Sequence, residues 1–318
     1  MPGMPVDARE LEVFEAARGR LEAIAYRLLG SANDAEDMVQ ETFLRWQAAD
    51  REMIETPAAW LTKVPTNLCL NRLGSARARR ETYVGQWLPE PVLAGDDMLG
   101  PSETAEQRES VTIAMLTLME RLAANERVVF VLREAFGYSH AEIAGLLDLS
   151  ETNCQQIYRR AKQHLAAPDR RRAPVDAPAA RKVVEEFLAA TLSGRTDDLV
   201  RLLSDDAISF GDGGGVVFSL PEPVTGKVRV ARFLRGLFTS GEARWEQIGG
   251  RPQLFAAVAN GAPALVVTVG ERLAGVITLD VTTDGIAAVH AMVNPAKLNR
   301  ARQEWAATEH GEPLTVPW

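Results

Sequence analysis

Apolar residues recur at helical spacing through the first half of the chain, and this spacing predicts a run of helices. Residues 8–48 predict two helices, because the first apolar pattern stops at Gly30 and either Ser31 or Asn33 can cap the next helix. The recurring apolar positions of the first helix are Val13, Phe14, Ala17, Leu21, Ile24, Leu28 and Leu29. Residues 103–135 predict two more helices with a shared buried face.

A further helix is predicted between these two regions. It begins after Thr56, with Pro57 at the first helical position, and continues to an arginine cluster that ends at Arg80. Pro65 lies within this segment, where it removes a backbone donor and clashes with the preceding turn. We therefore expect a kink or a break near Thr62.

Residues 136–162 predict a helix, a tight turn and a second helix. The apolar residues that can close a small core between the two helices are Ile143, Ala144, Leu147, Leu149, Cys154 and Ile157. The polar residues that remain outside, on or near the second helix, are Glu151, Thr152, Asn153, Gln155, Gln156, Arg159, Arg160 and Lys162. Amides and hydroxyls at the start of a helix suit base edges in the major groove, and arginines one turn later suit phosphates. This helix-turn-helix pattern makes DNA the leading partner.

The pattern changes after the basic, proline-bearing segment 168–178, which is the clearest domain boundary. Two helices split at Gly194 are followed by short strands. The predicted strands cover residues 207–210, 216–218, 264–269, 273–279 and 286–293. Helices followed by antiparallel strands indicate an α+β unit. The predicted fold is therefore multidomain, with two all-α parts and a C-terminal α+β part.

Residues 82–102 also interrupt the helical pattern. The segment is rich in proline, yet it carries the aromatic residues Tyr83 and Trp87. A purely flexible linker would be polar with few large apolar groups. We therefore expect this segment to dock on another part of the molecule.

Charge is unevenly distributed along the chain. The net charge of −8 argues against a protein that simply coats nucleic acid. The basic residues that form local clusters are Arg72, Arg77, Arg79 and Arg80, then Arg159, Arg160, Lys162, Arg170, Arg171 and Arg172. Such clusters can bind phosphate on an acidic protein, because charges act over a Debye length of about 8–10 Å.

Few features point to an extracellular or membrane protein. The two cysteines, Cys69 and Cys154, each lie in an apolar helical pattern, which favours neither a disulfide nor a zinc site and fits the reducing cytoplasm. No apolar run approaches the roughly 18 residues of a membrane span. The first residues lack the basic start and apolar core of a secretory signal.

Residues 10–167 resemble a bacterial sigma factor of the extracytoplasmic-function (ECF) class. Asp34–Trp46 resembles the region 2 helix that docks on the polymerase, and Trp60–Arg80 is similar to the part that opens and reads the −10 element. Residues 103–167 resemble region 4, which reads the −35 element. The resemblance implies core RNA polymerase and promoter DNA as partners.

Three further motifs resemble the group of ECF sigma factors that carries a fused C-terminal SnoaL-like domain. They are the linker motif Gln86–Pro91, Asp212–Gly215 and Asn294–Leu298. The chain departs from this pattern at Val216, where the group has lysine, and at Ala296, where it has a polar residue. The resemblance implies a sigma factor that is regulated by its own appended domain instead of a separate anti-sigma protein.

The resemblance divides the chain into five parts. These are region 2 at 1–81, a linker at 82–102, region 4 at 103–167, a second linker at 168–178 and the SnoaL-like domain at 179–318.

Candidate site residues follow from this division. Asp34, Asp37 and Glu41 share one helix face, and an acidic stripe can meet a basic partner surface. With Gln40, they are the residues implied to contact core polymerase. The residues assigned to the −10 element are Asn67, Arg72, Arg77, Arg79 and Arg80. Those assigned to the −35 element are Thr152, Asn153, Gln155, Gln156, Arg159, Arg160 and Lys162. The residues assigned to a regulatory interface are Trp87, Leu88, Pro89, Glu90, Pro91, Asp212, Gly213, Gly214, Asn294, Pro295, Lys297 and Leu298.

Two other functions are open to a chain of this kind. One is a ligand-sensing helix-turn-helix regulator that does not bind polymerase, and the other is a SnoaL-like isomerase or cyclase with an accessory DNA-binding part. The enzyme would need a carboxylate or histidine base inside the cone, for which Asp212, Asp280 and His290 are candidates. Their spacing does not demand catalysis, so we expect no catalytic residue, metal or cofactor. A small ligand in the cone could bias the arrangement of the DNA-reading parts.

Overall fold

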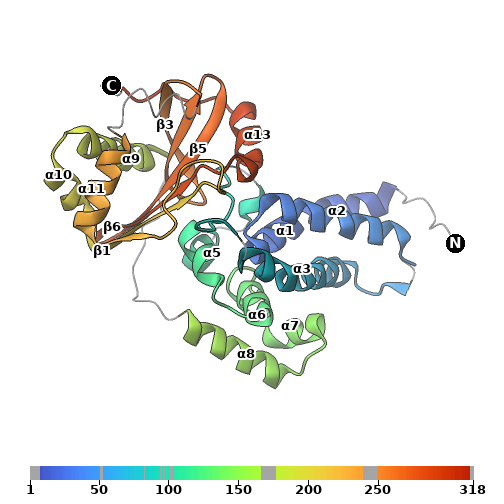
Figure 1. Cartoon of the computed structure of the whole chain (residues 1–318). Coiled ribbons are helices and arrows are strands. Elements are labelled where there is room, and N and C mark those ends of the chain that lie inside the picture. Colours follow the sequence, from blue (N-terminus) through green and yellow to red (C-terminus); the bar gives the residue numbers. More distant parts are fainter. Residues whose placement is uncertain are drawn as a thin grey trace. The chain divides into compact units, whose positions relative to one another are not determined.

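The chain forms two compact units in a computed structural model that describes residues 8–50, 53–81, 83–93, 95, 97–100, 104–165, 177–238 and 249–315 (Figure 1). The first unit comprises Met1–Glu81, Gly95–Val111 and Met115–Ala167. The second comprises Thr82–Ala94, Thr112–Ala114 and Pro168–Trp318. Linker residues 83–93 therefore belong with the C-terminal unit, although they follow the helices of the first unit directly in sequence.

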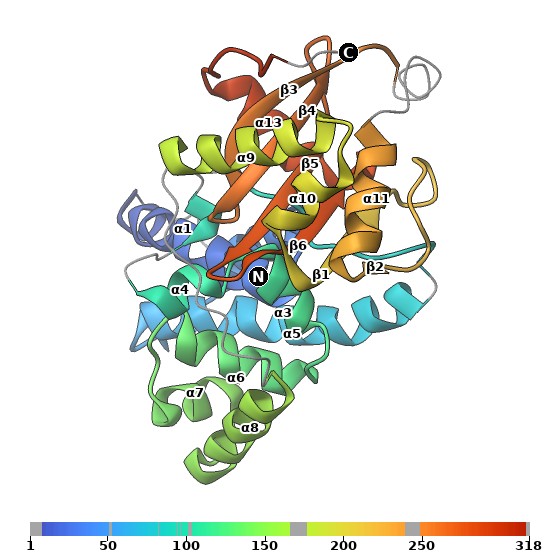
Figure 2. The same cartoon turned by 90° about the vertical axis from the view of Figure 1, so that its left-hand side faces the viewer.

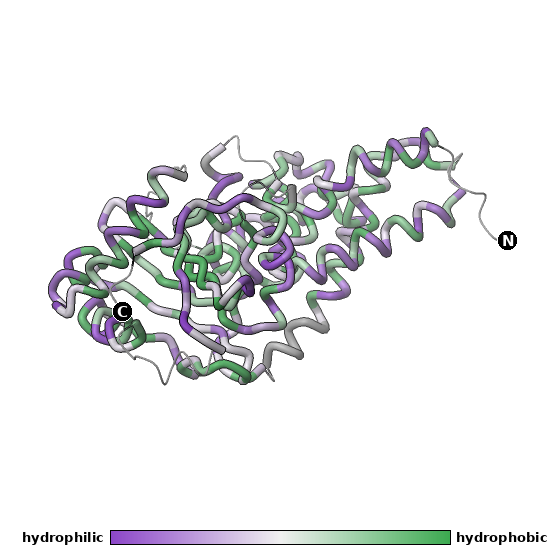
Figure 3. Tube along the Cα trace, turned by 90° about the horizontal axis from the view of Figure 1, so that it is seen from above, coloured by the Kyte–Doolittle hydropathy of each residue, from purple (hydrophilic) through white to green (hydrophobic). Residues whose placement is uncertain are grey.

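Three helices begin the first unit, namely α1 (Ala8–Leu29), α2 (Ala32–Ala48) and α3 (Pro57–Glu81). The chain turns between α1 and α2 at Gly30, which has a positive φ of 65°. Of the two possible caps for α2, Ser31 is used, and its hydroxyl accepts from the Asp34 amide at 3.1 Å. The alternation of hydrophobic and hydrophilic residues along the helices next to the N-terminus is visible in Figure 3. Their apolar faces meet in a core that contains Phe14, Leu21, Val39, Trp46 and Leu61.

The helix α3 is continuous through Pro65, so of the kink or break expected near Thr62 the break does not occur. Threonine hydroxyls supply hydrogen bonds beside the proline. Thr66 Oγ1 donates to the Thr62 carbonyl oxygen at 2.7 Å, and Thr62 Oγ1 donates to the Ala58 carbonyl oxygen at 2.9 Å. Pro65 is itself buried. Tertiary packing of the buried face of α3 around Pro65 therefore offsets the missing backbone hydrogen bond.

The remaining helices that lie wholly or mostly in the first unit are shorter. They are α4 (Ala105–Glu109), α5 (Ile113–Met119), α6 (Ala124–Glu134), α7 (His140–Leu147) and α8 (Glu151–His164), preceded by the 3₁₀ turn η2 (Asp97–Leu99). Residues 104–135 thus contain three helices where the sequence pattern predicts two. Thr104 and Gln107 form a reciprocal capping box that starts α4 separately, and Glu126 caps the Ala123 amide to start α6.

The second unit is built on a six-stranded sheet in the order β2-β1-β6-β5-β4-β3. Its strands are β1 (Leu203–Asp212), β2 (Val224–Thr225), β3 (Pro252–Ala259), β4 (Ala262–Val269), β5 (Arg272–Thr282) and β6 (Gly285–Met292). The sheet is mixed, because β1 runs parallel to β6 while the other pairs are antiparallel. The expectation of purely antiparallel strands is therefore wrong in this one pairing, although the α+β class is confirmed.

Both faces of the sheet are covered. The helices α9 (Ala177–Leu192), α10 (Thr196–Leu202) and α11 (Lys227–Phe238) pack on one face, as Figure 2 shows. Leu88 and Leu93 of the linker pack on the other face, together with Trp305 of α13 (Asn299–Ala307). None of the helices within the described residues has the length and apolar character that a membrane span requires.

Residues 216–218 do not form the strand that their apolar character predicts. The amides of Val216 and Val217 both donate to the Gly213 carbonyl oxygen at 3.0 Å, which closes a turn. Val216 and Phe218 are 77% and 65% exposed. The sequence pattern also misses β3, whose first residue is Pro252; proline is tolerated there because β3 is an edge strand.

Candidate functional site

The helix α8 presents its polar side chains outward, as a DNA-reading helix requires. Cys154, Ile157 and Ala161 are buried against the rest of the fold, and Ser150 caps the helix by accepting from the Asn153 amide at 3.2 Å. Of the seven residues assigned to the −35 element, Asn153 is half-buried and the exposed ones are Thr152, Gln155, Gln156, Arg159, Arg160 and Lys162. The structure therefore places these side chains together on one accessible face.

The preceding turn holds α8 at a fixed angle to α7. Ser139 and Glu142 form a capping box at the start of α7, and Asp148 ends it with a left-handed φ of 55°. The Tyr158 hydroxyl donates to Glu134 of α6, and the Tyr158 ring packs against His140 of α7 at 5.2 Å between centroids. Burial, followed by the Glu134 carboxylate, raises the pKa of Tyr158 to about 12, so the phenol stays a donor.

The residues assigned to the −10 element lie on α3. Asn67 is half-buried, and the side chain of Arg72 is 34% exposed. The backbone of α3 remains helical to Glu81, but the side chains of Arg77, Arg79 and Arg80 lie outside the described residues.

The residues assigned to the polymerase contact lie on α2. Asp37 and Gln40 are exposed, whereas Asp34 forms an ion pair with Arg72 of α3. Glu41 pairs with Arg45 one turn along the same helix at 2.9 Å. The outward face of α2 is thus accessible at Asp37 and Gln40. Asp34 is instead paired with Arg72, a residue assigned to the −10 element.

Two buried arginines, which the sequence analysis does not single out, join α1 to the later helices of the first unit. Arg27 Nε donates to Ser110 Oγ at 2.9 Å, and its guanidinium lies 5.3 Å from the centre of the Phe136 ring. Arg127 donates to the Arg27 carbonyl oxygen at 3.2 and 3.3 Å and pairs with Glu120. Burial lowers the pKa of Arg27 to about 10 and that of Arg127 to about 9, so both side chains remain charged at neutral pH.

Two polar contacts also join α3 to the helix-turn-helix part. The Tyr138 and Thr62 hydroxyls are 3.1 Å apart, and Tyr138 is the donor because the Thr62 hydrogen is given to Ala58. Lys63 Nζ lies 2.8 Å from the Asp148 carboxylate. The region that carries Asn67 and Arg72 is therefore held against the region that carries α8.

A second site lies within the C-terminal unit, where residues 83–93 dock. Its centre is Asp212, at the end of β1, whose side chain is fully buried. Oδ1 accepts from the Tyr83 hydroxyl at 2.6 Å and from the Gly214 amide at 3.1 Å. Oδ2 accepts from the Leu88 amide at 2.9 Å and from Lys297 Nζ at 2.8 Å. Four donors thus satisfy one buried carboxylate, and two of them come from the linker.

Lys297 completes this site from the other side. Its Nζ donates to the Leu88 carbonyl oxygen at 2.8 Å as well as to Asp212. The ammonium also lies 4.6 Å from the centre of the Tyr83 ring and 4.3 Å from that of Trp87, within range of cation–π attraction. Burial and the Asp212 carboxylate raise the pKa of Tyr83, so its hydroxyl remains a donor.

Two glycines allow this close approach. A Cβ on Gly213 would lie 1.9 Å from the Val217 carbonyl oxygen. Gly214 has a φ of +60°, and a Cβ there would lie 2.3–2.8 Å from the Asn294 amide group. Asn294 Nδ2 donates to the Tyr83 hydroxyl at 2.7 Å, and its Oδ1 accepts from the Ala296 amide at 3.0 Å. The structure thus brings together the three motifs assigned to the regulatory interface.

The rest of the docked segment pairs with the sheet edge and α13. The Val92 amide donates to Asn260 Oδ1 at 3.0 Å, and the Asn260 amide donates back to the Val92 carbonyl oxygen at 2.9 Å. The Leu93 amide donates to Glu304 at 2.7 Å. The sequence analysis misses Asn260 and Glu304, because no local pattern links them to the linker. Leu88 to Leu93 are all buried by these contacts.

The three candidate catalytic bases of the C-terminal unit each lie in a different environment. Asp212 is occupied by the linker, His290 stacks on Phe210 with ring centres 5.1 Å apart, and Asp280 is half-buried on β5. Among the described residues, no three His, Cys, Asp or Glu side chains gather as metal ligands would.

Comparison with known proteins places these features in a family. Residues 13–79 match the model of Sigma-70 region 2, and residues 112–165 match that of Sigma-70, region 4. The chain is 40% identical over 228 residues to the ECF RNA polymerase sigma factor SigJ of Mycobacterium tuberculosis, covering 72% of this chain and 73% of that protein. It is 31% identical over 299 residues to the probable ECF RNA polymerase sigma factor SigI of M. tuberculosis, covering 92% and 95%.

The crystal structure of M. tuberculosis extracytoplasmic function sigma factor SigJ is similar to this fold, with a TM-score of 0.70 and 32% identity. The match covers 91% of this chain and 98% of that chain, so it includes the C-terminal unit. With both sigma regions matched in order and relatives similar over most of their length, the chain belongs to the ECF RNA polymerase sigma factors.

Proposed function

We propose that the C-terminal unit regulates this sigma factor in cis, by holding residues 83–93 of the linker between α3 and α4. The observation that carries the proposal is the buried contact of Lys297 with both Asp212 and the Leu88 carbonyl oxygen, which ties the linker backbone to that unit. A buried ion pair that is fully hydrogen-bonded is costly to break by removing one partner. Release of the linker at this point therefore requires the contacts of Lys297 with both Asp212 and Leu88 to be given up.

The sigma activity itself is assigned to the first unit. The exposed face of α2 with Asp37 and Gln40 contacts core RNA polymerase, α3 contacts the −10 element, and the exposed face of α8 contacts the −35 element. The first unit acts in the cytoplasm, where core RNA polymerase and promoter DNA are found. Family membership favours this assignment over a regulator that does not bind polymerase.

Promoter binding requires the two DNA-reading regions to separate. The −10 and −35 elements lie about 25 base pairs apart, which is roughly 85 Å of duplex at 3.4 Å per base pair. The contacts of Thr62 with Tyr138 and of Lys63 with Asp148 hold α3 and the helix-turn-helix part together. These contacts must break before both elements can be read.

Linker docking limits this separation. The linker between Glu81 and Thr104 has 22 residues, which could reach about 75 Å when fully extended. When residues 83–93 are docked, their span is fixed, and the part of the linker that can still extend is mainly the 10 residues from 94 to 103, with a reach of about 35 Å. A docked linker therefore opposes the open form, and its release increases transcription initiation.

Reconstitution with core RNA polymerase and a promoter library tests the proposal. Lys297→Met removes the ammonium of the buried pair, and Tyr83→Phe removes two linker hydrogen bonds while leaving that pair intact. Both variants should raise the yield of defined transcripts severalfold, with Lys297→Met above Tyr83→Phe. Lys227→Met is the matched control, because Lys227 pairs with Asp205 on the surface.

Transcript yields equal to the parent for both variants would overturn regulation by the linker. Failure of the parent protein to associate with core polymerase would overturn the assignment of α2. A yield raised by Lys227→Met as much as by Lys297→Met would show that the effect is general destabilisation and would also count against the proposal.

A further inference from the structure

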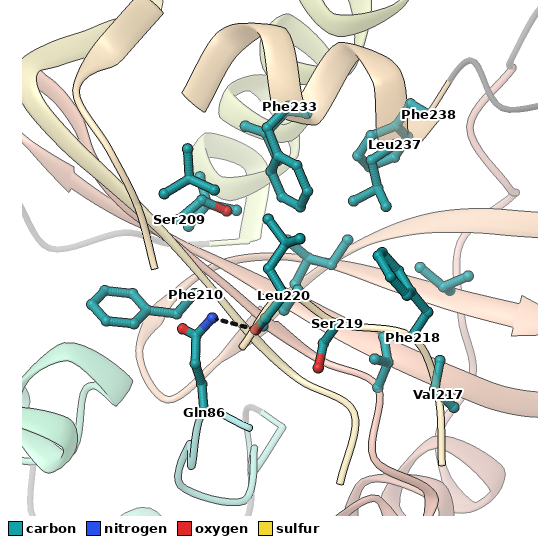
Figure 4. A pocket seen from close by; sticks show the side chains of 18 of the residues that line it. Gln86, Ser209, Phe210, Val217, Phe218, Ser219, Leu220, Phe233, Leu237 and Phe238 are labelled. Carbon is teal, nitrogen blue, oxygen red and sulfur yellow. Dashed lines mark hydrogen bonds between the residues drawn. The ribbon is translucent and has the colours of Figure 1, made fainter. Parts of the chain in front are cut away.

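The C-terminal unit encloses a cavity of about 510 Å³ between α11, the sheet and the segment 216–220. Phe233, Leu237 and Phe238 of α11 face it from one side, and Phe218 and Leu220 from the other (Figure 4). Among the described lining residues, Glu222 alone is ionisable, and it is exposed. A charged ligand would therefore find no buried counter-charge in this wall, whereas an apolar one would bury its surface.

One polar group in the cavity wall comes from the linker. Gln86 Nε2 donates to the Leu220 carbonyl oxygen at 2.8 Å, as the dashed line in Figure 4 marks. Gln86 Oε1 is buried and finds no hydrogen-bond partner among the described residues. Because Oε1 has almost no accessible surface, a ligand donor reaches it through a small rotation of the Gln86 side chain, and then relieves the desolvation cost of an acceptor without a partner.

We infer that this cavity binds a neutral, mostly apolar molecule that donates one N–H or O–H hydrogen bond to Gln86. The size fits small-molecule sites, which are typically about 300–1,000 Å³. The donor requirement follows from the amide oxygen, because Nε2 already donates to Leu220 whereas Oε1 accepts from none of the described residues. The segment 216–220 forms part of the wall, and its Val216 and Phe218 are the exposed edge through which a ligand enters.

The ligand also acts on the linker, since Gln86 lies two residues before Leu88, the residue held by Asp212 and Lys297. A ligand bonded to Gln86 adds a contact that exists only when residues 83–93 are docked. By linkage, it stabilises the docked form and opposes release. This consequence rests on the proposed function, in which docking limits initiation.

Binding of N-phenyl-1-naphthylamine to the full-length protein tests the site. This probe is neutral and apolar with a single N–H donor, and its fluorescence rises in apolar surroundings. Ala291→Phe fills the cavity from β6 and should weaken probe binding at least tenfold. Ala274→Phe is the matched control, because Ala274 is half-buried on β5 and does not line the cavity.

The hydrogen bond from the ligand to Gln86 is tested separately, with a variant that does not fill the cavity. Gln86→Met should weaken binding of the N–H probe about threefold to tenfold, as expected for loss of one hydrogen bond. Its affinity for the N-methylated probe, which has no donor, should stay equal to that of the parent. Equal affinities of Gln86→Met and parent for the N–H probe would overturn the role of Gln86.

Hydrogen exchange reports the link to the linker. The Leu88, Val92 and Leu93 amides donate to Asp212, Asn260 and Glu304, so saturation with the N–H probe should slow their exchange. Unsaturable binding, equal binding to Ala291→Phe, or unchanged exchange at these amides would each overturn the inference. These results leave the effect of Lys297→Met on transcription untouched, so failure of this inference is distinct from failure of the regulatory proposal.

Discussion

The two units bury their charged side chains in different ways. In the first unit, the buried Arg127 guanidinium pairs with Glu120 and also donates to the Arg27 carbonyl oxygen over 3.2 and 3.3 Å. In the second unit, the Asp212 carboxylate receives four donors at 2.6–3.1 Å, one of which is a buried ammonium. Both sets of bonds are charge-assisted and therefore about twice as strong as neutral ones, but in the second unit two of the four donors belong to the linker.

This difference indicates an order of events. The contacts between α3 and the helix-turn-helix part are the Tyr138–Thr62 hydrogen bond and the partly exposed Lys63–Asp148 ion pair. They can be exchanged for water at modest cost, because each is worth about 1 kcal/mol net. The linker dock is lost only when its buried ion pair is undone. We therefore expect the helical unit to loosen readily on its own and the linker to act as the limiting restraint.

Breaking the dock should have the largest effect. Lys297→Met leaves the buried Asp212 carboxylate without its cation and should lower the free energy of unfolding of the C-terminal unit by about 3–5 kcal/mol. Chemical denaturation of the full chain, followed by hydrogen exchange at Leu88, measures this change. Lys227→Met should be nearly neutral, because exposed ion pairs add little. A small loss for Lys297→Met would mean that the ion pair does not hold the linker.

A substitution that creates a steric clash in the docking site of the linker should have the next largest effect. Gly214→Ala combines a positive φ with contacts of 2.3–2.8 Å to the Asn294 amide group, and should cost about 2–3 kcal/mol. Gly226→Ala has a similar φ of +87° but open space around the added Cβ, so it should cost about 1 kcal/mol. The difference between the two unfolding free energies isolates the clash with Asn294. Equal losses would show that backbone strain alone matters at Gly214.

Loosening the helical unit should have a smaller effect. Tyr138→Phe removes the hydrogen bond to Thr62 and should lower the unfolding free energy by about 0.5–1.5 kcal/mol. A double-mutant cycle with Thr62→Val separates this bond from the bond that Thr62 makes to Ala58. A coupling energy near zero would show that the hydrogen bond between Tyr138 and Thr62 does not restrain α3.

The smallest effect is expected for a single exposed arginine. Arg159→Ala should leave stability unchanged, since Arg159 is exposed, in contrast to the buried Arg127. It should weaken binding to all DNA sequences alike and reduce the slope of log affinity against log salt by about 0.9. Titrations of the holoenzyme with promoter DNA at several salt concentrations measure the slope. An unchanged slope would remove Arg159 from the phosphate contacts.

Much of the fold was predictable because its signals are local. The helix-turn-helix follows from apolar spacing, from Ser139 and Ser150 as caps and from the turn at Asp148, all within about 25 residues of one another. The α+β class and the sigma family were predicted from the sequence and are confirmed. The strand expected at 216–218 does not form, because a turn closes at Gly213. Of the kink or break expected near Thr62, the break does not occur, because the packing of α3 overrides the local preference of Pro65.

The sequence by itself determined the helices, the order of the two sigma regions and the three motifs around Trp87, Asp212 and Asn294, because periodicity, capping and motif residues act over short stretches of chain. Only the tertiary structure decided that Arg27 and Arg127 are buried within the helical unit, that Asn260 and Glu304 hold the linker, and that Gln86 faces a cavity. These features join residues 80 to more than 200 positions apart. Their energies come from burial and hydrogen bonding between distant segments, which no local pattern records.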